Sequence, residues 1–209
     1  MRFILAVLCI VTTIALVSCG PRGVIIQERN MAQRNPTVYE FDAPMSAVRH
    51  SLNEVRGAQW SSQQPPFHGA FLAWKEDADP FAEKILEKPG NEHDAYLYGT
   101  TEEVGKSELY LQDGRSLSYC ANFHIHLVPV SDSRTRVEVF THNSRVVVGE
   151  RWYLAHGNAL MYVDVSPSSI EEYQILLDIG AKLSVKDMPK LALPATNAPV
   201  KQLKKLPYR

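Results

Sequence analysis

The sequence predicts an α+β domain in which an antiparallel β-sheet packs against an N-terminal helix and a long C-terminal helix. Three observations support this class. Helical periodicity follows residue 42, strand-like patterns dominate residues 95–148, and a second helical pattern follows Pro167. The apolar fraction of 45% and the charged fraction of 22% are typical of a folded chain, so residues 37–183 are expected to form a single domain.

The predicted domain begins with a strand and a helix. Residues 37–41 alternate β-branched and aromatic side chains with others, which is typical of a strand. Asp42 and Pro44 supply a capping residue and a first-turn proline for a helix that Gly57 is expected to end. The apolar side chains of this helix recur at helical spacing, at Met45, Val48, Leu52 and Val55.

Residues 58–94 are interrupted by prolines and glycines and predict irregular structure, with one short helix at 81–88. Their large aromatic side chains indicate that this stretch packs over the core; these are Trp60, Phe67, Phe71 and Trp74.

Antiparallel strands are then predicted at 96–98, 108–111, 116–130 and 135–148. The polar turn at 131–134 joins the last two strands into a long hairpin.

The C-terminal part begins with a mixed stretch at 150–158, and residues 162–165 suit a last strand. Ser168–Glu171 resembles a capping box and predicts a helix that ends near Leu183. Its buried side is expected to contain Ile170, Tyr173, Leu177 and Gly180. Residues 184–209, with prolines among lysines, predict a disordered basic tail.

Charge is distributed unevenly along the chain. The whole chain has a formal net charge of −1, whereas residues 184–209 have a net charge of +5 and residues 20–183 a net charge of −7. A nucleic-acid-binding domain places its basic surface on the fold itself. The acidic body therefore argues against a nucleic-acid partner.

The N-terminus has the pattern of an export signal. Arg2 precedes an apolar run from Phe3 to Val17, which at 15 residues is shorter than the ~20 that cross a membrane. The run ends in Leu16-Val17-Ser18-Cys19, which resembles the lipobox of bacterial lipoproteins.

This resemblance implies cleavage between Ser18 and Cys19 and lipidation of Cys19, which would anchor an exported protein to the bacterial membrane. Gly20 after the cysteine implies the outer membrane in a cell that has one. An ordinary signal peptide or an uncleaved anchor is the alternative. The expected organisation is a signal peptide at 1–18, a lipidated tether at 19–36, the domain at 37–183 and the tail at 184–209.

The remaining cysteines do not form a pair. Cys9 would leave with the signal peptide and Cys19 would hold the lipid, so Cys120 stands alone and no internal disulfide is expected. Cys120 could act as a nucleophile beside a histidine, but a buried thiol is the simpler interpretation.

The order of predicted elements in 37–183 resembles the helix-grip arrangement of START-like domains and of small domains in some outer-membrane assembly lipoproteins. The resemblance rests on this order and on Phe41-Asp42-Ala43-Pro44. It implies a sheet closed over a long helix, with an apolar cavity for a hydrophobic ligand.

Two short motifs fail as ligand sites. Gly105-Lys106-Ser107 resembles the end of a P-loop, but Gly99 is one residue too far away and a strand-like sequence follows. The stretch after Asp77-Ala78-Asp79 lacks the other ligands of a calcium loop. The chain also lacks the Gly-x-Ser-x-Gly and His-Glu-x-x-His signatures, so we expect no enzyme activity, no cofactor and no nucleotide.

Three histidines fall on one face of the predicted hairpin. The odd positions of its first strand are apolar and form the buried face, so His124 and His126 lie on the opposite face. Pairing odd residues with odd residues places His142 opposite His124 or one step away. Imidazoles at this spacing can bind zinc or copper, so these three are candidate metal ligands. The alternative is a polar sheet face that meets water.

Three functions are therefore open. The first is an envelope lipoprotein whose domain faces the periplasm or the cell surface and binds a protein or cell-wall partner. The second is a carrier of a hydrophobic ligand, with Trp60, Trp74 and Trp152 near its cavity. The third is a metal-binding protein that uses the hairpin histidines.

Overall fold

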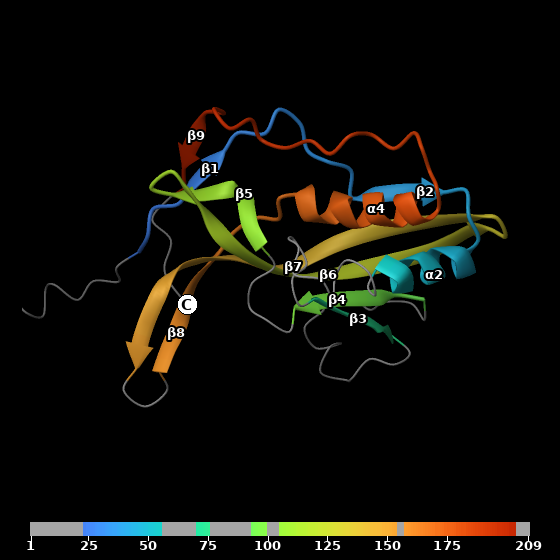
Figure 1. Cartoon of the computed structure of the whole chain (residues 1–209), viewed down its shortest axis with the longest axis horizontal. Helices are drawn as coiled ribbons and strands as arrows, with labels where there is room; N and C mark the ends of the chain where they lie inside the picture. Colours follow the sequence, from blue (N-terminus) through green and yellow to red (C-terminus); the bar gives the residue numbers. More distant parts are fainter. Residues whose placement is uncertain (1–22, 56–69, 76–92, 100–104, 154–156, 204–209) are drawn as a thin grey trace, which may run out of the picture.

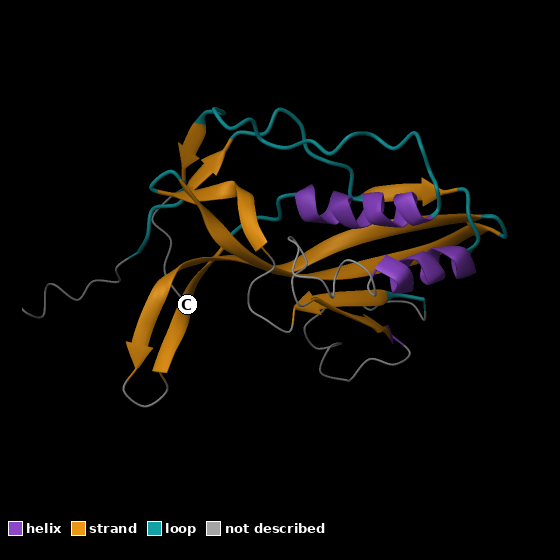
Figure 2. Cartoon of the chain, in the orientation of Figure 1, coloured by secondary structure: helices purple, strands orange, loops and turns teal. Residues whose placement is uncertain are grey.

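The computed structural model describes residues 23–55, 70–75, 93–99, 105–153 and 157–203. Figures 1 and 2 show a long twisted sheet with two helices lying against one of its faces. The elements in chain order are β1 Gln27–Arg29, β2 Val38–Phe41, α2 Met45–Val55, β3 Ala70–Trp74, β4 Ala95–Gly99, β5 Gly105–Gln112, β6 Arg115–Ser131, β7 Arg134–Tyr153, β8 Gly157–Asp164, α4 Ile170–Lys182 and β9 Val200–Gln202.

The predicted α+β, helix-grip-like class is wrong. In the described part of the chain the structure is mostly β, with 49% in strands and two short helices, and its antiparallel sheet curls into a half-barrel. The C-terminal helix α4 has only 13 residues and is not the long helix that was expected.

The additional strands lie in segments for which the sequence predicts no regular structure. β3 lies in the stretch expected to be irregular, and β7 runs through the mixed stretch to Tyr153 and returns as β8. The expected tether and tail supply two more strands, β1 and β9.

The β6–β7 hairpin is the spine of the sheet, with strands of 17 and 20 residues. On the β6 side, β5 pairs near the start of β6 and β4 pairs with residues 123–125. On the β7 side, β2 pairs with residues 135–138 and β8 with residues 145–153. The strands β1 and β9 extend the sheet beyond β5, and β3 extends it beyond β4; all pairs are antiparallel.

The core lies between the helices and the sheet face formed by the odd residues of the hairpin. The predicted inward positions Phe123, Ile125 and Leu127 are buried. They belong to one apolar cluster with Phe41, Val48, Leu52, Val137, Val139, Tyr173, Ile175, Leu176 and Ile179. The predicted alternation in the hairpin and the predicted apolar stripe of α2 at Val48 and Leu52 are therefore confirmed.

The start of α4 differs from the capping box that the sequence suggested. Ser169 takes a left-handed conformation with φ of 65° and its side chain caps nothing. Ser168, the first residue of the predicted box, supplies the side-chain hydrogen bonds: its Oγ accepts the Ile170 N–H at 3.0 Å and donates to the Glu171 carboxyl group. The helix itself starts at Ile170, so the residue in the N-cap position is Ser169 and not Ser168.

The expected tether and tail both join the fold. β1 lies between β5 and β9, so residues 27–29 and 200–202 are hydrogen-bonded parts of the sheet. The prediction of a disordered tail is therefore wrong for residues 184–203. The structure describes residues 23–36 of the expected tether, and Cys19 lies outside the described residues.

Several predicted features lie outside the described residues, namely the leader with Ser18 and Cys19, the helix at 81–88, the acidic motif at 77–79, and the side chains of Trp60, Phe67 and Phe71. Among the helices that the structure does describe, none is long and apolar enough to span a membrane.

Candidate metal centre

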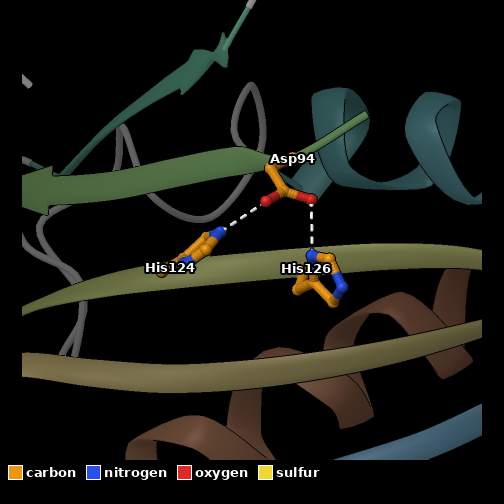
Figure 3. A group of neighbouring side chains, drawn as sticks. All are labelled: Asp94, His124 and His126. Carbon is orange, nitrogen blue, oxygen red and sulfur yellow. Dashed lines mark hydrogen bonds and ion pairs between the residues drawn. The ribbon is translucent and has the colours of Figure 1, made fainter. Parts of the chain in front are cut away.

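Two antiparallel strands bring the candidate site together. His124 and His126 are two residues apart on β6, so their side chains project from the same face. β4 runs beside this segment with Tyr96 opposite His124. Asp94 immediately precedes β4 and extends toward both histidines, as Figure 3 shows.

The Asp94 carboxylate contacts one nitrogen of each ring. His124 Nε2 lies 2.7 Å from Asp94 Oδ2, and His126 Nδ1 lies 2.8 Å from Asp94 Oδ1. The side chains of Asp94 and His124 are 0% and 2% exposed, whereas that of His126 is 27% exposed. The cluster is thus sealed on the aspartate side and open to solvent at His126.

The two histidines keep Asp94 ionised in this buried position. Burial alone would raise the pKa of Asp94, because desolvation disfavours the charged carboxylate. The hydrogen bond from His124 and the electrostatic attraction of His126 and His124 outweigh burial, so the pKa of Asp94 falls below its ordinary value of 3.8. The site therefore holds a buried negative charge between two imidazoles.

Aromatic rings pack around His124 on the same sheet face. The ring centroids of Tyr96, Phe140 and His142 lie 5.1, 5.8 and 6.2 Å from that of His124. His124 Nδ1 is buried with no hydrogen-bond partner among the described residues. These contacts hold the His124 ring in place. The sheet face around His124 is therefore packed by side chains and is not a solvent-exposed polar face.

The structure changes the predicted ligand set. His124 and His126 come together as expected, but His142 pairs with Asn122, one step along from His124, and is not part of the group of converging donors. The third donor is Asp94, and the donor atoms of Asp94, His124 and His126 lie within 4.8 Å of one another.

Sequence reasoning missed Asp94 because it belongs to a stretch expected to be irregular. One signal was available. Asp94 shares the parity of Tyr96, so extending the strand predicted at 96–98 by two residues places its carboxylate on one face with the Tyr96 ring. The histidines reach this carboxylate only because β4 pairs with β6 in the observed register, and no local sequence pattern encodes that pairing.

The other sequence candidates do not converge on this site. Gly105-Lys106-Ser107 lies within strand β5, so it cannot open a helix as a P-loop does. Cys120 is buried and in no disulfide.

Two imidazole nitrogens and one carboxylate oxygen are a donor set that suits a divalent transition metal ion. Zinc binds such ligands at about 2.0–2.2 Å, which puts tetrahedral neighbours roughly 3.3 Å apart. The two 2.7–2.8 Å contacts are hydrogen bonds, so an ion would replace the two N–H protons and move the donors apart by about half an ångström. An ion can reach the site from solvent on the exposed side of His126.

No family model, curated protein or solved structure matches this chain. Any function must therefore be argued from the chain's own residues.

Proposed function

We propose that this protein is a lipid-anchored bacterial envelope protein whose β domain binds a divalent transition metal ion at Asp94, His124 and His126. The observation that carries the metal assignment is the convergence of three donor atoms, from two strands, within 4.8 Å. Each residue has a distinct part in it. Asp94 supplies the negative charge and buried His124 a fixed nitrogen donor. His126 is partly exposed and is the ligand that an ion from solvent contacts first.

The donor set favours a site with an open coordination position. Three protein ligands leave room for water at a fourth position, as in zinc sites with two histidines and one carboxylate. Zinc is the appropriate first probe, and iron(II) and copper(II) accept the same donors. The proposal is for binding, because the three converging donor atoms carry that assignment.

The anchoring part of the proposal rests on Leu16-Val17-Ser18-Cys19 and the short apolar run before it. Chain length limits how far the domain could lie from this anchor. Gly23, the first described residue, is four positions after Cys19, and four positions span at most about 14 Å when extended. Acyl chains on Cys19 would therefore hold the domain against the membrane surface.

The metal assignment is tested on the mature protein after saturation with zinc and removal of free ion. Wild-type protein should retain one zinc ion per chain by elemental analysis. Asp94→Asn and His126→Gln should each weaken zinc binding by at least ~10-fold in calorimetric titration. His126→Gln is the cleaner variant, because the His126 side chain is partly exposed whereas Asp94 is fully buried.

The matched control is His50→Gln, which changes an exposed histidine on α2, outside the converging donors. It should bind zinc as tightly as wild type. Equal zinc affinity in wild type and in a folded His126→Gln protein would contradict the proposal, as would equal loss of affinity in His50→Gln.

Binding of a protein or cell-wall partner is a second candidate function. A surface pocket of about 540 Å³ lies between the start of α2 and the end of β6, with Met45 and Pro129 in its lining and Val130 48% exposed beside them. In-cell crosslinking followed by mass spectrometry tests it. Recovery of the protein without any enriched partner would count against this function. Carriage of a hydrophobic ligand stays a prediction.

A further inference from the structure

The β7–β8 hairpin forms an arm that leaves the body of the sheet. From Gly149 to Tyr153, β7 pairs with β8 alone among the described strands, because its pairing with β6 ends at Val147. Figure 1 shows this arm projecting from the end of the molecule that also contains β1. A two-stranded hairpin without a covering layer gains little stability from its own side chains.

The arm nevertheless presents apolar side chains to solvent. Trp152 is 64% exposed, more than any other large hydrophobic residue in the described part of the chain. Leu160 pairs with Glu150, two residues from Trp152, so Leu160 and Trp152 share one face of the arm. Between Arg151 and Met161 the sequence has one residue charged at neutral pH, Arg151 itself. Burial in the fold therefore does not explain the Trp152 ring on this arm.

The lipid anchor specifies what lies near this arm. The tether from Cys19 brings the membrane within about 14 Å of Gly23, a few residues before β1. Along the long axis of the molecule, β1 and the arm lie at one end and the β6–β7 turn at the other. An anchor at Cys19 would therefore bring the end of the molecule that contains the arm close to the membrane.

We propose that the β7–β8 arm inserts the side chain of Trp152 into the interface between headgroups and acyl chains of this membrane. Tryptophan prefers this region, because its ring is apolar and its N–H still reaches polar partners. The arm would give the anchored domain a second point of contact with the membrane and so a fixed orientation, which the lipid alone does not provide. This inference rests on the anchoring part of the proposed function.

The experiment uses lipidated full-length mature protein reconstituted in vesicles of phosphatidylcholine and phosphatidylglycerol, with or without brominated acyl chains. The chain has three tryptophans, so the difference in emission between wild type and Trp152→Phe isolates Trp152. That emission should shift to shorter wavelength on reconstitution and be quenched by the brominated lipids.

Failure of the inference and failure of the anchor give different results. If the protein floats with the vesicles and Trp152 emission is the same with and without bromine, the anchor is intact and the inference is wrong. If the wild-type protein does not float with the vesicles, the anchor itself fails. Trp152 emission could also shift to shorter wavelength as the protein concentration rises, without quenching by the brominated lipids. Trp152 would then lie in a contact between copies of the protein, and the inference would be wrong.

Discussion

The side-chain amide of Asn35 holds the backbone of Ala192 with two hydrogen bonds. Asn35 Nδ2 donates to the Ala192 carbonyl at 2.9 Å, and the Ala192 N–H donates to Asn35 Oδ1 at 2.7 Å. The Asn35 N–H also donates to Ser169 Oγ at 3.0 Å, next to the start of α4. A buried side chain thus joins the segment before β2 to the segment after α4, 157 residues apart.

Replacing Asn35 with alanine should destabilise the protein. Both hydrogen bonds to Ala192 are lost, and at 0.5–1.5 kcal/mol each the free energy of unfolding should fall by about 1–3 kcal/mol. Urea unfolding followed by circular dichroism measures this. The matched control is Gln33→Ala, an exposed polar residue in the same segment. Equal midpoints for Asn35→Ala and wild type would mean that the two segments are not joined in solution.

Deleting residues 199–209 should weaken the β1 end of the sheet. This deletion removes β9 and the hydrogen bonds from Leu203 N–H to Ile26 O and from Asn30 N–H to Pro199 O. Hydrogen exchange at Gln27–Arg29 should accelerate, because these residues lose one of their two neighbouring strands. Deletion of residues 204–209 alone removes no described strand and is the control. Unchanged exchange at β1 in the longer deletion would support a tail that does not pair.

Glu171 should make stability depend on pH. Burial raises the pKa of Glu171 to about 7, against the lowering effect of the hydrogen bond from Ser168. The native state therefore holds a proton that the unfolded state releases near the ordinary value of 4.5. Stability from this group is fully present below pH 4.5 and is lost as pH rises to about 7, by an amount on the order of 3 kcal/mol.

Glu171→Gln removes this ionisation while keeping the shape of the side chain. The decline in unfolding free energy between pH 4.5 and pH 7 should become smaller in this variant than in wild type. Glu40→Gln, which changes an exposed residue of β2, should leave the decline as in wild type. Identical slopes for wild type and Glu171→Gln would show that Glu171 ionises in the native state as it does in the unfolded chain.

Elements with a strong local pattern could be predicted from the sequence. The β6–β7 hairpin has alternating residues around a polar turn, and α2 has apolar residues at helical spacing, so each was recognisable by itself. β1 and β9 have three residues each, mostly polar, and neither alternates. They are strands only because distant segments align beside each other, and the half-barrel follows from such pairings.

The candidate site shows the same division. Parity within β6 is enough to place His124 and His126 on one face from the sequence alone. Asp94 arrives from a different strand, and the β4–β6 register that brings it there joins residues about 30 positions apart. The donor that completes the site was therefore the one that sequence reasoning missed.

Asp94→Asn should destabilise the protein even without metal. In the absence of an ion the carboxylate accepts hydrogen bonds from both His124 and His126, while buried at 0% exposure. An asparagine offers one oxygen and one NH₂ group, so one histidine N–H loses its acceptor and faces a donor. The free energy of unfolding in a chelator should fall by about 2–4 kcal/mol, since hydrogen bonds to charged groups contribute more than neutral ones.

Asp132→Asn, in the exposed β6–β7 turn, is the control and should change the free energy of unfolding little. If Asp94→Asn unfolds like wild type in chelator yet loses zinc, Asp94 serves only as a ligand, and the histidine pair is held in place by its aromatic neighbours.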